Sequence, residues 1–331
     1  MGQYETKTTN AISVQGLTKR FSEIQAVSNL TFETLNGELF GFLGPNGAGK
    51  TTTINMLTGL ARPDTGQIRI GGMDCTRNPK AAQHMVGVVP DDSNLYLELT
   101  GFENLCFCGA LYGMRKKARN ARARQLLKEF GLADAANRRF GGYSRGMKRR
   151  LTIAAGIIHK PEILFLDEPT TGIDVSSARQ IRHLITELHH LGTTIFLTTH
   201  YIEEAERLCE RIAFMVNGTI VKIDTVSRLL QPVKGRHVMR LAVSSAEPLL
   251  LGKLVAAFPD LLFQGLGNGF IHVEADEPVH VGPLVRFVED QGIVVSEARR
   301  MHLSLEDVFM NVTGIKAAAM KKEKEKAGVR P

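Results

Sequence analysis

The sequence lacks any long hydrophobic run. Its longest apolar stretches are short segments such as Ile163–Leu166 and Leu249–Leu251, whereas a transmembrane helix needs about 20 consecutive apolar residues. We therefore expect that this chain of 331 residues does not span a membrane by itself. Residues 1–10 are polar and contain no apolar core of a signal peptide, so no secretory signal is expected.

Cysteine is also scarce. The four cysteines are Cys75, Cys106, Cys108 and Cys209, and only Cys106 and Cys108 lie close together in the sequence. A C-x-C pair without a second pair makes a poor zinc site. We expect reduced thiols in a cytosolic protein, because disulfides form mainly in oxidising compartments.

Positive charge is present but unevenly distributed. The formal net charge is +7, yet lysine and arginine are concentrated between residues 114 and 150 and in the tail from Lys316. Because the basicity is local, it gives weak support for nucleic-acid binding, and we expect no nucleic-acid partner. A solvated helix face, acidic loops of a partner protein or lipid headgroups explain these basic segments equally well.

The most informative motif is a complete phosphate-binding loop, G-x-x-x-x-G-K-T, at residues 44–51. An apolar run at residues 39–43 predicts a buried strand before it, and residues 52–57 read as a helix after it. Backbone N–H groups of such a loop bind phosphates, Lys50 would reach the outer phosphates, and the Thr51 hydroxyl would contact Mg2+. The predicted nucleotide-binding residues are Gly44, Pro45, Asn46, Gly47, Ala48, Gly49, Lys50, Thr51 and Thr52.

Strand-like and helix-like segments alternate up to about Leu230, which predicts an α/β domain with a mostly parallel sheet. The expected strands are Ile12–Val14, Thr31–Phe32, Glu38–Leu43, Ile163–Leu166 and Thr194–Leu197. The expected helices are Lys50–Gly59, Gly101–Tyr112, Lys116–Phe130, Ser144–Ile158, Ser176–Leu191 and Ile202–Leu208.

The pattern changes after Pro232 to a βαββαβ order with one more helix, which predicts a small ferredoxin-like α+β domain. Its expected elements are His237–Val243, Leu249–Phe258, Leu261–Gln264, Phe270–Val273, Val281–Asp290, Ile293–Ser296 and Leu305–Val312. We therefore predict domains at residues 1–232 and 233–314. The Lys/Glu-rich residues 315–331 are expected to form a disordered basic tail.

Two acids follow the apolar run Ile163–Leu166. A buried parallel strand delivers residues at its carboxyl end beside the phosphate loop. Asp167 is then placed to hold Mg2+, and Glu168 to act as the general base that polarises the attacking water. The alternative is a strand that simply ends in solvated acids.

At this point the chain resembles the ATP-binding cassette (ABC) family of ATPases. Residues 169–174, P-T-T-G-I-D, resemble the D-loop of that family, which includes Asp174, and Thr198-Thr199-His200 resembles its switch histidine. Tyr143-Ser144-Arg145-Gly146-Met147 lies where the family has its L-S-G-G-Q signature. These motifs keep the family's order and spacing over about residues 12–225, and imply an ABC cassette with a phosphate-loop parallel-sheet core and a helical subdomain.

The resemblance assigns further roles. Ser144 and Gly146, within the signature segment that also contains Arg145 and Met147, would contact the γ-phosphate held by the opposite subunit. His200 would hold the same phosphate, unless it is only a histidine at a strand end. Phe21 follows Lys19-Arg20, where the family has an aromatic residue that stacks on adenine. The alternative for Phe21 is core packing.

Two positions depart from the family pattern. Arg145 replaces a glycine of the signature, but Ser144 and Gly146 are retained, so we expect a functional site. After the run Val86–Pro90 the family usually has the glutamine of the Q-loop, whereas this chain has Asp91-Asp92. A carboxylate at Asp91 can still reach Mg2+ or the attacking water, but it adds a negative charge.

The leading interpretation is an ATP- and Mg2+-dependent ATPase subunit of an ABC exporter, acting as a homodimer on a separate integral membrane transporter subunit. It would be peripheral, at the cytoplasmic face of the cell membrane, and residues 95–112 would dock the partner. Residues 305–309, L-E-D-V-F, resemble the end of an accessory domain in the drug, polysaccharide and sodium exporter branch. The alternatives are a soluble ABC ATPase acting on DNA or ribosomes, and a phosphate-loop GTPase or kinase, a class that lacks the Ser144 and His200 elements.

Overall fold

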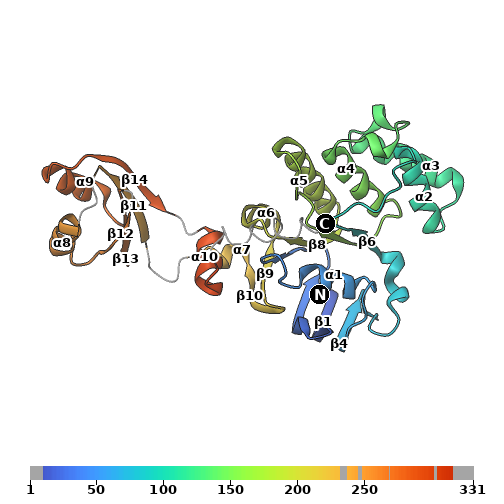
Figure 1. The fold of residues 1–331 in the computed structure, drawn as a ribbon, viewed down its shortest axis with the longest axis horizontal. Coiled ribbons are helices and arrows are strands. Elements are labelled where there is room, and N and C mark those ends of the chain that lie inside the picture. Colours follow the sequence, from blue (N-terminus) through green and yellow to red (C-terminus); the bar gives the residue numbers. More distant parts are fainter. Residues whose placement is uncertain (1–9, 232–236, 245–247, 268, 302–303, 316–331) are drawn as a thin grey trace, which may run out of the picture. The chain divides into compact units, whose positions relative to one another are not determined.

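The computed structural model describes residues 10–231, 237–244, 248–267, 269–301 and 304–315. The chain divides into two compact units (Figure 1): one ends at Thr225 and resumes at Val312, and the other runs from Val226 to Asn311. The domain boundaries expected after residues 232 and 314 stay predictions. Apart from its first residue, the expected basic tail lies outside the described residues.

The first unit is an α/β domain, as predicted. Its strands are β1 (Asn10–Phe21), β2 (Ile24–Leu35), β3 (Leu39–Leu43), β4 (Thr65–Ile70), β5 (Met73–Asp74), β6 (Val86–Val89), β7 (Ile163–Asp167), β8 (Thr194–Thr199), β9 (Arg211–Val216) and β10 (Thr219–Thr225). Its helices are α1 (Lys50–Leu57), α2 (Gly101–Leu111), α3 (Lys116–Glu129), α4 (Arg145–Gly156), α5 (Val175–His190) and α6 (Ile202–Leu208), with short 3-10 turns at Pro79–Met85, Ala133–Ala135 and Phe140–Gly142.

Two sheets form the core of this unit. The larger sheet has the order β10-β9-β3-β8-β7-β6, and all its neighbouring strands are parallel except β10, which is antiparallel to β9. Every residue of β3, β7 and β8 is buried, which explains why these strands read as continuous apolar runs. The second sheet, β2-β1-β4-β5, is antiparallel.

Phenylalanines join the two sheets. The ring of Phe32 on β2 stacks on that of Phe40 on β3, with centroids 5.8 Å apart and planes at 5°. It also contacts Phe42 at 5.1 Å and Phe196 of β8 at 5.9 Å. Aromatic pairs at these separations add about 0.5–1.5 kcal/mol each beyond the area that they bury. This packing fixes the parallel sheet, and therefore the loops at the carboxyl ends of its strands.

Helices α2, α3 and α4 gather at one end of the unit as a helical subdomain (Figure 1). A capping box starts α2: Thr100 Oγ1 accepts from Glu103 N at 3.1 Å, and Glu103 Oε2 accepts from Thr100 N at 2.8 Å. No helix in the described part of the chain is long and apolar enough to cross a membrane.

The second unit is built on the antiparallel sheet β12-β13-β11-β14. The chain order of these strands with their two intervening helices is the split βαβ arrangement. Its core contains Leu241, Leu254, Ile271 and Val273, all fully buried. The elements are α7 (Val226–Leu229), β11 (His237–Val243), α8 (Pro248–Ala257), β12 (Leu262–Gly267), β13 (Phe270–Ala275), α9 (Val281–Asp290) and β14 (Val295–Met301), and the last described helix of the chain is α10 (Leu305–Thr313).

Several expected element bounds are wrong. The segments Ile12–Val14 and Thr31–Phe32 are parts of the 12-residue strands β1 and β2. The expected helix start at Ser144 is one residue early, because Ser144 is the N-cap of α4.

The strand expected at Ile293–Ser296 is β14 (Val295–Met301), which begins later and extends over Arg299 and Arg300. As an edge strand it carries polar residues, and hydrophobicity alone does not detect such strands. For the same reason β10, which also lies at a sheet edge, was not predicted.

Candidate active site

The phosphate-binding loop connects β3 to α1, as the motif predicts. A Cβ atom on Gly44 would lie 2.1 Å from the carbonyl oxygen of Met215, and one on Gly49 would lie 2.4 Å from that of Ala26. Gly49 also has φ +101°, a conformation that favours glycine. The loop therefore packs against its neighbours so closely that only glycine fits at these two positions.

Lys50 begins α1, and its side chain is only 6% exposed. Its ammonium donates to the carbonyl oxygens of Gly44 at 2.7 Å and Pro45 at 3.1 Å. It also forms an ion pair with Glu168 Oε1 at 3.3 Å. The lysine thus links the phosphate loop to the acid at the end of β7, and this pairing offsets the cost of burying its charge.

Thr51 and Asp167 are directly bonded. The Thr51 hydroxyl donates to Asp167 Oδ2 at 2.8 Å, and the Thr198 hydroxyl donates to the other carboxyl oxygen. Burial raises the pKa of Asp167, and these two hydrogen bonds partly oppose that rise.

The Thr51 hydroxyl and the Asp167 carboxylate lie side by side and are hard oxygen ligands, which suit Mg2+. The described residues contain no cluster of three or more His, Cys, Asp or Glu side chains that could hold a metal ion.

Glu168 follows β7 and has the left-handed conformation φ +49°. A conformation of this kind costs a residue other than glycine about 1–3 kcal/mol. Its Oε2 accepts from His200 Nδ1 at 2.7 Å and from the Thr171 hydroxyl at 3.0 Å. Burial alone raises the pKa of Glu168, but the hydrogen bond from His200 and the charge of Lys50 lower it below the ordinary value. The group is therefore a carboxylate near neutral pH, the form that can accept a proton.

A cavity of about 420 Å³ lies over the phosphate loop. Asp91 and Glu168 line it together with residues of the loop, so the structure brings four predicted motifs together: the phosphate loop, the acids after β7, His200 bonded to Glu168, and the Q-loop residue Asp91. The lining residues are Ile24, Gln25, Ala26, Asn46, Gly47, Ala48, Gly49, Lys50, Thr51, Thr52, Asp91, Glu168, Asn217 and Gly218.

The signature residues do not line this cavity. Ser144 caps α4 by accepting a hydrogen bond from Met147 N at 3.3 Å, and both Ser144 and Arg145 are exposed. Gly146 packs against Ser177 so tightly that a Cβ would lie 2.3 Å from its hydroxyl oxygen. Asp174 in turn caps α5 through Ser177 N at 2.9 Å. The exposed N-terminus of α4 presents N–H donors that could bind an anion outside this subunit's own cavity.

Phe21 ends β1 and is 50% exposed, so core packing does not explain it. Its ring lies 5.3 Å from the ammonium of Lys19, and its strand partner is Ile24, which lines the cavity. Phe21 itself is not among the lining residues. Its adenine-stacking role stays a prediction.

Arg149 is a buried site residue that the sequence analysis did not single out. It lies on α4 and is 6% exposed. Its guanidinium donates to the backbone carbonyl oxygens of four residues in two segments: Asp167 at 2.6 Å and Pro169 at 2.9 Å, and Asp91 at 3.0 Å and Pro90. An apolar helix face with one arginine gives no local signal for such contacts, so sequence patterns could not have found them.

The turn Asn217-Gly218 between β9 and β10 was also missed, although it lines the cavity. Gly218 N donates to Ala48 O at 3.0 Å, and Ser28 N donates to Gly218 O at 2.8 Å. Asn217 has φ +48° and Gly218 φ +77°. Here a signal existed, because Asn-Gly between two strands is a strong indicator of a hairpin turn.

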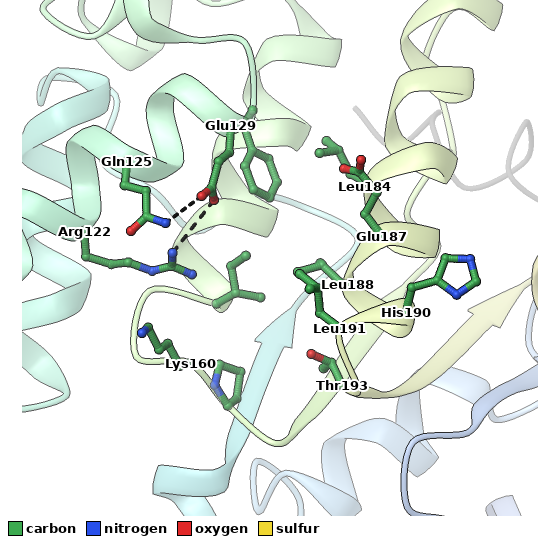
Figure 2. A pocket seen from close by; sticks show the side chains of 13 residues that line it. Arg122, Gln125, Glu129, Lys160, Leu184, Glu187, Leu188, His190, Leu191 and Thr193 are labelled. Carbon is green, nitrogen blue, oxygen red and sulfur yellow. Dashed lines mark hydrogen bonds and ion pairs between the residues drawn. The ribbon is translucent and has the colours of Figure 1, made fainter.

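A larger cavity, of about 640 Å³, lies elsewhere in the first unit, between α3 and α5 (Figure 2). Leu184, Leu188 and Leu191 line one side of it, and on the other side Gln125 and Arg122 contact Glu129 at 2.7 and 3.8 Å. It contains none of the predicted site residues. The chemistry of the lining groups, and not cavity size, identifies the smaller cavity as the candidate active site.

Comparisons with known proteins agree with this site. A family model described as "ABC transporter" matches residues 27–171. The daunorubicin/doxorubicin resistance ATP-binding protein of Streptomyces peucetius is 38% identical over 93% of this chain and 94% of its own length. The Nod factor export ATP-binding protein I of Paraburkholderia xenovorans is 38% identical over 92% of this chain and 97% of its own length.

Solved structures are similar to about two thirds of the chain. The ATP-binding subunit of an ABC transporter has a TM-score of 0.61 and 29% identity, and covers 67% of this chain and 92% of its own. A dimeric ATP-binding cassette in a post-hydrolysis state, bound to ADP and Pi, has a TM-score of 0.61 and 26% identity, and covers 65% of this chain and 98% of its own.

Proposed function

This chain belongs to the ABC transporter family as an ATP-binding and ATP-hydrolysing subunit of an exporter, and we propose how its residues carry out that reaction. The observation that carries the proposal is the network around one cavity: Thr51 bonded to Asp167 at 2.8 Å, with Lys50 and His200 both bonded to Glu168 at 3.3 and 2.7 Å. It gathers a phosphate-binding cation, a metal-binding pair and a base within one site.

In this mechanism the N–H groups of the phosphate loop and the ammonium of Lys50 bind the β- and γ-phosphates of ATP. Thr51 and Asp167 would hold Mg2+, with Asp91 as a further candidate ligand. When bound, the ion neutralises charge that develops on the phosphate oxygens. Asn46, Gly47 and Ala48 shape the loop around the phosphates, and Phe21 is proposed to stack on adenine.

Glu168 would accept a proton from the attacking water. Its lowered pKa keeps it ionised for that role. Since a carboxylate only accepts hydrogen bonds, Nδ1 of His200 carries the proton in their 2.7 Å contact. A second proton, on Nε2, would let His200 donate to a γ-phosphate oxygen as well. His200 would then both orient the base and contact the group that is transferred to water.

The signature residues act in trans in this proposal. Ser144, Gly146 and the first N–H groups of α4 lie outside their own subunit's cavity, so they are proposed to complete the site of a second copy in a head-to-tail two-fold dimer. Arg145 and Met147 would flank the contact between the two copies. Asp174, which caps α5, would fix the start of that helix beside the contact. The dimeric state of the similar cassette supports this arrangement.

The test of the hydrolytic mechanism is Glu168→Gln. It keeps the groups that bind ATP and removes the base, so we expect ATP affinity within about twofold of wild type and turnover lower by about 100-fold or more. The same variant with ATP should double its mass in solution, because the dimer is trapped before hydrolysis. A wild-type rate in this variant contradicts Glu168 as the base, and a strictly monomeric species at saturating ATP contradicts the trans site.

We further propose that the subunit is held at the cytoplasmic face of a membrane by a separate transporter subunit, with the surface of residues 95–112 as its docking region. Tyr96, Leu97, Phe107 and Leu111 in this region are between 40% and 72% exposed, which suits a protein contact. Fractionation with and without the membrane subunit, followed by a wash in about 0.5 M salt, tests it, since salt screens purely electrostatic attachment. Co-purification with DNA or ribosomes instead would favour the soluble alternative.

A further inference from the structure

The backbone at the proposed base has a conformation that its own sequence disfavours. Glu168 has φ +49°, where glycine is the usual residue. The next residue is Pro169, and proline restricts the residue before it to extended conformations. Such a backbone persists only where surrounding groups hold it in place. The contacts that hold Glu168 therefore decide where its carboxylate lies.

Two sets of contacts surround this residue. The N–H of Glu168 donates to the Thr198 carbonyl oxygen at 3.0 Å and lies 3.3 Å from the Thr198 hydroxyl oxygen, which fixes it to β8. Arg149 contacts the residues on both sides of it: Nη2 donates to Asp167 O at 2.6 Å, and Nε donates to Pro169 O at 2.9 Å. Because a guanidinium is planar and its donors have fixed directions, it sets the distance and orientation of the two carbonyls together.

We propose that Arg149 is a positioning residue for the catalytic base: by bridging the carbonyls of Asp167 and Pro169 it holds the left-handed backbone at Glu168, and so aims the carboxylate between Lys50 and His200. The inference rests on the proposed role of Glu168 as the base. Arg149 is not among the residues that line the cavity, so it acts through the backbone segments that it holds.

The same guanidinium connects the base to two other parts of the site. Arg149 lies on α4, whose N-cap is the signature residue Ser144, and it also donates to the backbone carbonyl of the Q-loop residue Asp91 at 3.0 Å. A shift of α4 or of the Q-loop would therefore reach the backbone of Glu168 through one rigid side chain. A partner protein bound at α4 or at the Q-loop could therefore change the position of the Glu168 carboxylate.

Glu204 holds the next residue from another helix. It lies in the first turn of α6, is 3% exposed, and accepts from the Thr170 hydroxyl at 2.6 Å. The segment Pro169–Thr170 is thus held by Arg149 of α4 and by Glu204 of α6. Burial lowers the pKa of the Arg149 guanidinium, and the negative charges of Asp91, Asp167 and Glu204 partly oppose that shift.

The test uses Arg149→Lys in the full chain. A lysine keeps the charge, but its ammonium cannot reproduce the planar bridge, so we expect kcat to fall about 10- to 100-fold while the KM for ATP stays within about twofold, since small misplacements of a catalytic group have effects of this size. The matched control is Arg150→Lys on the same helix. Arg150 donates to Phe130 O at 2.9 Å in the helical subdomain, away from Glu168, and the control should keep kcat within about twofold.

A double substitution separates positioning from general damage. If Arg149 acts only through Glu168, Arg149→Lys should cause no further loss of turnover in the Glu168→Gln background. Equal losses in both backgrounds, a wild-type kcat for Arg149→Lys, or an equal loss in Arg150→Lys would each overturn the proposal. Should Arg149→Lys melt below the assay temperature, Arg149→Gln, which leaves no buried charge, carries the same test. Failure of the base assignment is seen independently, as wild-type turnover in Glu168→Gln alone.

Discussion

The two units of this chain bury different kinds of side chain. In the described part of the second unit, every fully buried side chain is apolar, as with Leu241 and Ile271. The first unit buries ionisable side chains as well, and six of them gather around the carboxyl ends of β7 and β8: Lys50, Arg149, Asp167, Glu168, His200 and Glu204. Glu38, which precedes β3, is also buried and pairs with Arg211 at 2.9 Å. Burying a charge is unfavourable unless it is paired and hydrogen-bonded. We infer that the buried charges around β7 and β8 of the first unit serve the reaction, whereas the buried side chains of the second unit serve the packing of its core.

Ion pairs show the same difference. In the first unit Lys50 and Glu168 are 6% and 7% exposed, and removing either partner leaves a buried charge. In the second unit Arg240 and Glu297 lie 3.3 Å apart but are 32% and 42% exposed. Exposed pairs of this kind contribute about 0–1 kcal/mol. We therefore expect charge substitutions to have large effects in the first unit and small ones in the second.

The largest expected effect is that of Lys50→Ala. It removes a cation that binds the outer phosphates and leaves Glu168 without its partner, so ATP affinity should fall about 100-fold or more. The matched control is Lys253→Ala in the second unit, where the exposed ammonium donates to Gln291 Oε1 at 2.7 Å. Nucleotide titration by calorimetry measures both. Similar ATP affinities in the two variants would contradict the expected difference between charge substitutions in the first and second units.

His200→Ala should have the next largest effect, a fall in kcat of about 10- to 100-fold. The bond from His200 opposes the effect of burial and lowers the pKa of Glu168. Glu168 thus adds stability above its unfolded pKa, and this is lost as pH falls through its lower folded pKa. Without His200 the pKa of Glu168 rises, so the acidic limb of the pH–rate profile should move to higher pH.

The control for this profile is His272→Ala, whose ring contacts Glu274 at 3.4 Å in the second unit. It should leave both kcat and the position of the acidic limb unchanged. An unchanged limb in His200→Ala would show that the histidine does not set the protonation of the base.

A smaller effect is expected at Asp91. Asp91→Gln should keep ATPase activity within a few fold, because an amide oxygen can replace the carboxylate as a ligand. Asp91→Ala should shift the Mg2+ concentration needed for half-maximal turnover upward. A Mg2+ titration of both variants, with Asp92→Ala as control, measures this. If Asp92→Ala shows the shift and Asp91→Ala does not, the neighbouring residue has the role.

The smallest effect on turnover is expected from a substitution that creates a cavity in the core of the second unit. Ile271→Ala removes a fully buried side chain of its core and should destabilise that unit by about 2–5 kcal/mol. ATP turnover should stay within about twofold, because no described residue of this unit lines the phosphate cavity. Amide hydrogen exchange along the chain shows which of the two units loses stability. A parallel loss of turnover would show that the reaction depends on this unit.

The parts of the site that sequence predicted are those with short local patterns. Residues 44–51 and the acids after β7 are contiguous motifs, and parallel-sheet topology brings them together. The contacts of Arg149 were not predictable, because backbone carbonyls of Asp167, Pro169 and Asp91 become neighbours only in the fold. Edge strands such as β14 were misplaced because their exposed faces are polar. The roles of Phe21, His200 and the signature residues stay predictions; His200→Ala tests the role of the histidine, and the ATP-dependent mass of Glu168→Gln tests that of the signature residues.

The left-handed backbone at Glu168 has a consequence for engineering this protein. Substituting glycine at positions with positive φ is an established way to remove strain, and a redesign guided by backbone geometry would choose position 168. That change would delete the proposed base and leave a binder of ATP with little turnover. The conformation that folding disfavours thus coincides with the proposed base, so relieving it would exchange activity for stability. Any effort to raise the melting temperature of this chain should therefore keep Glu168 and seek its gains in the second unit.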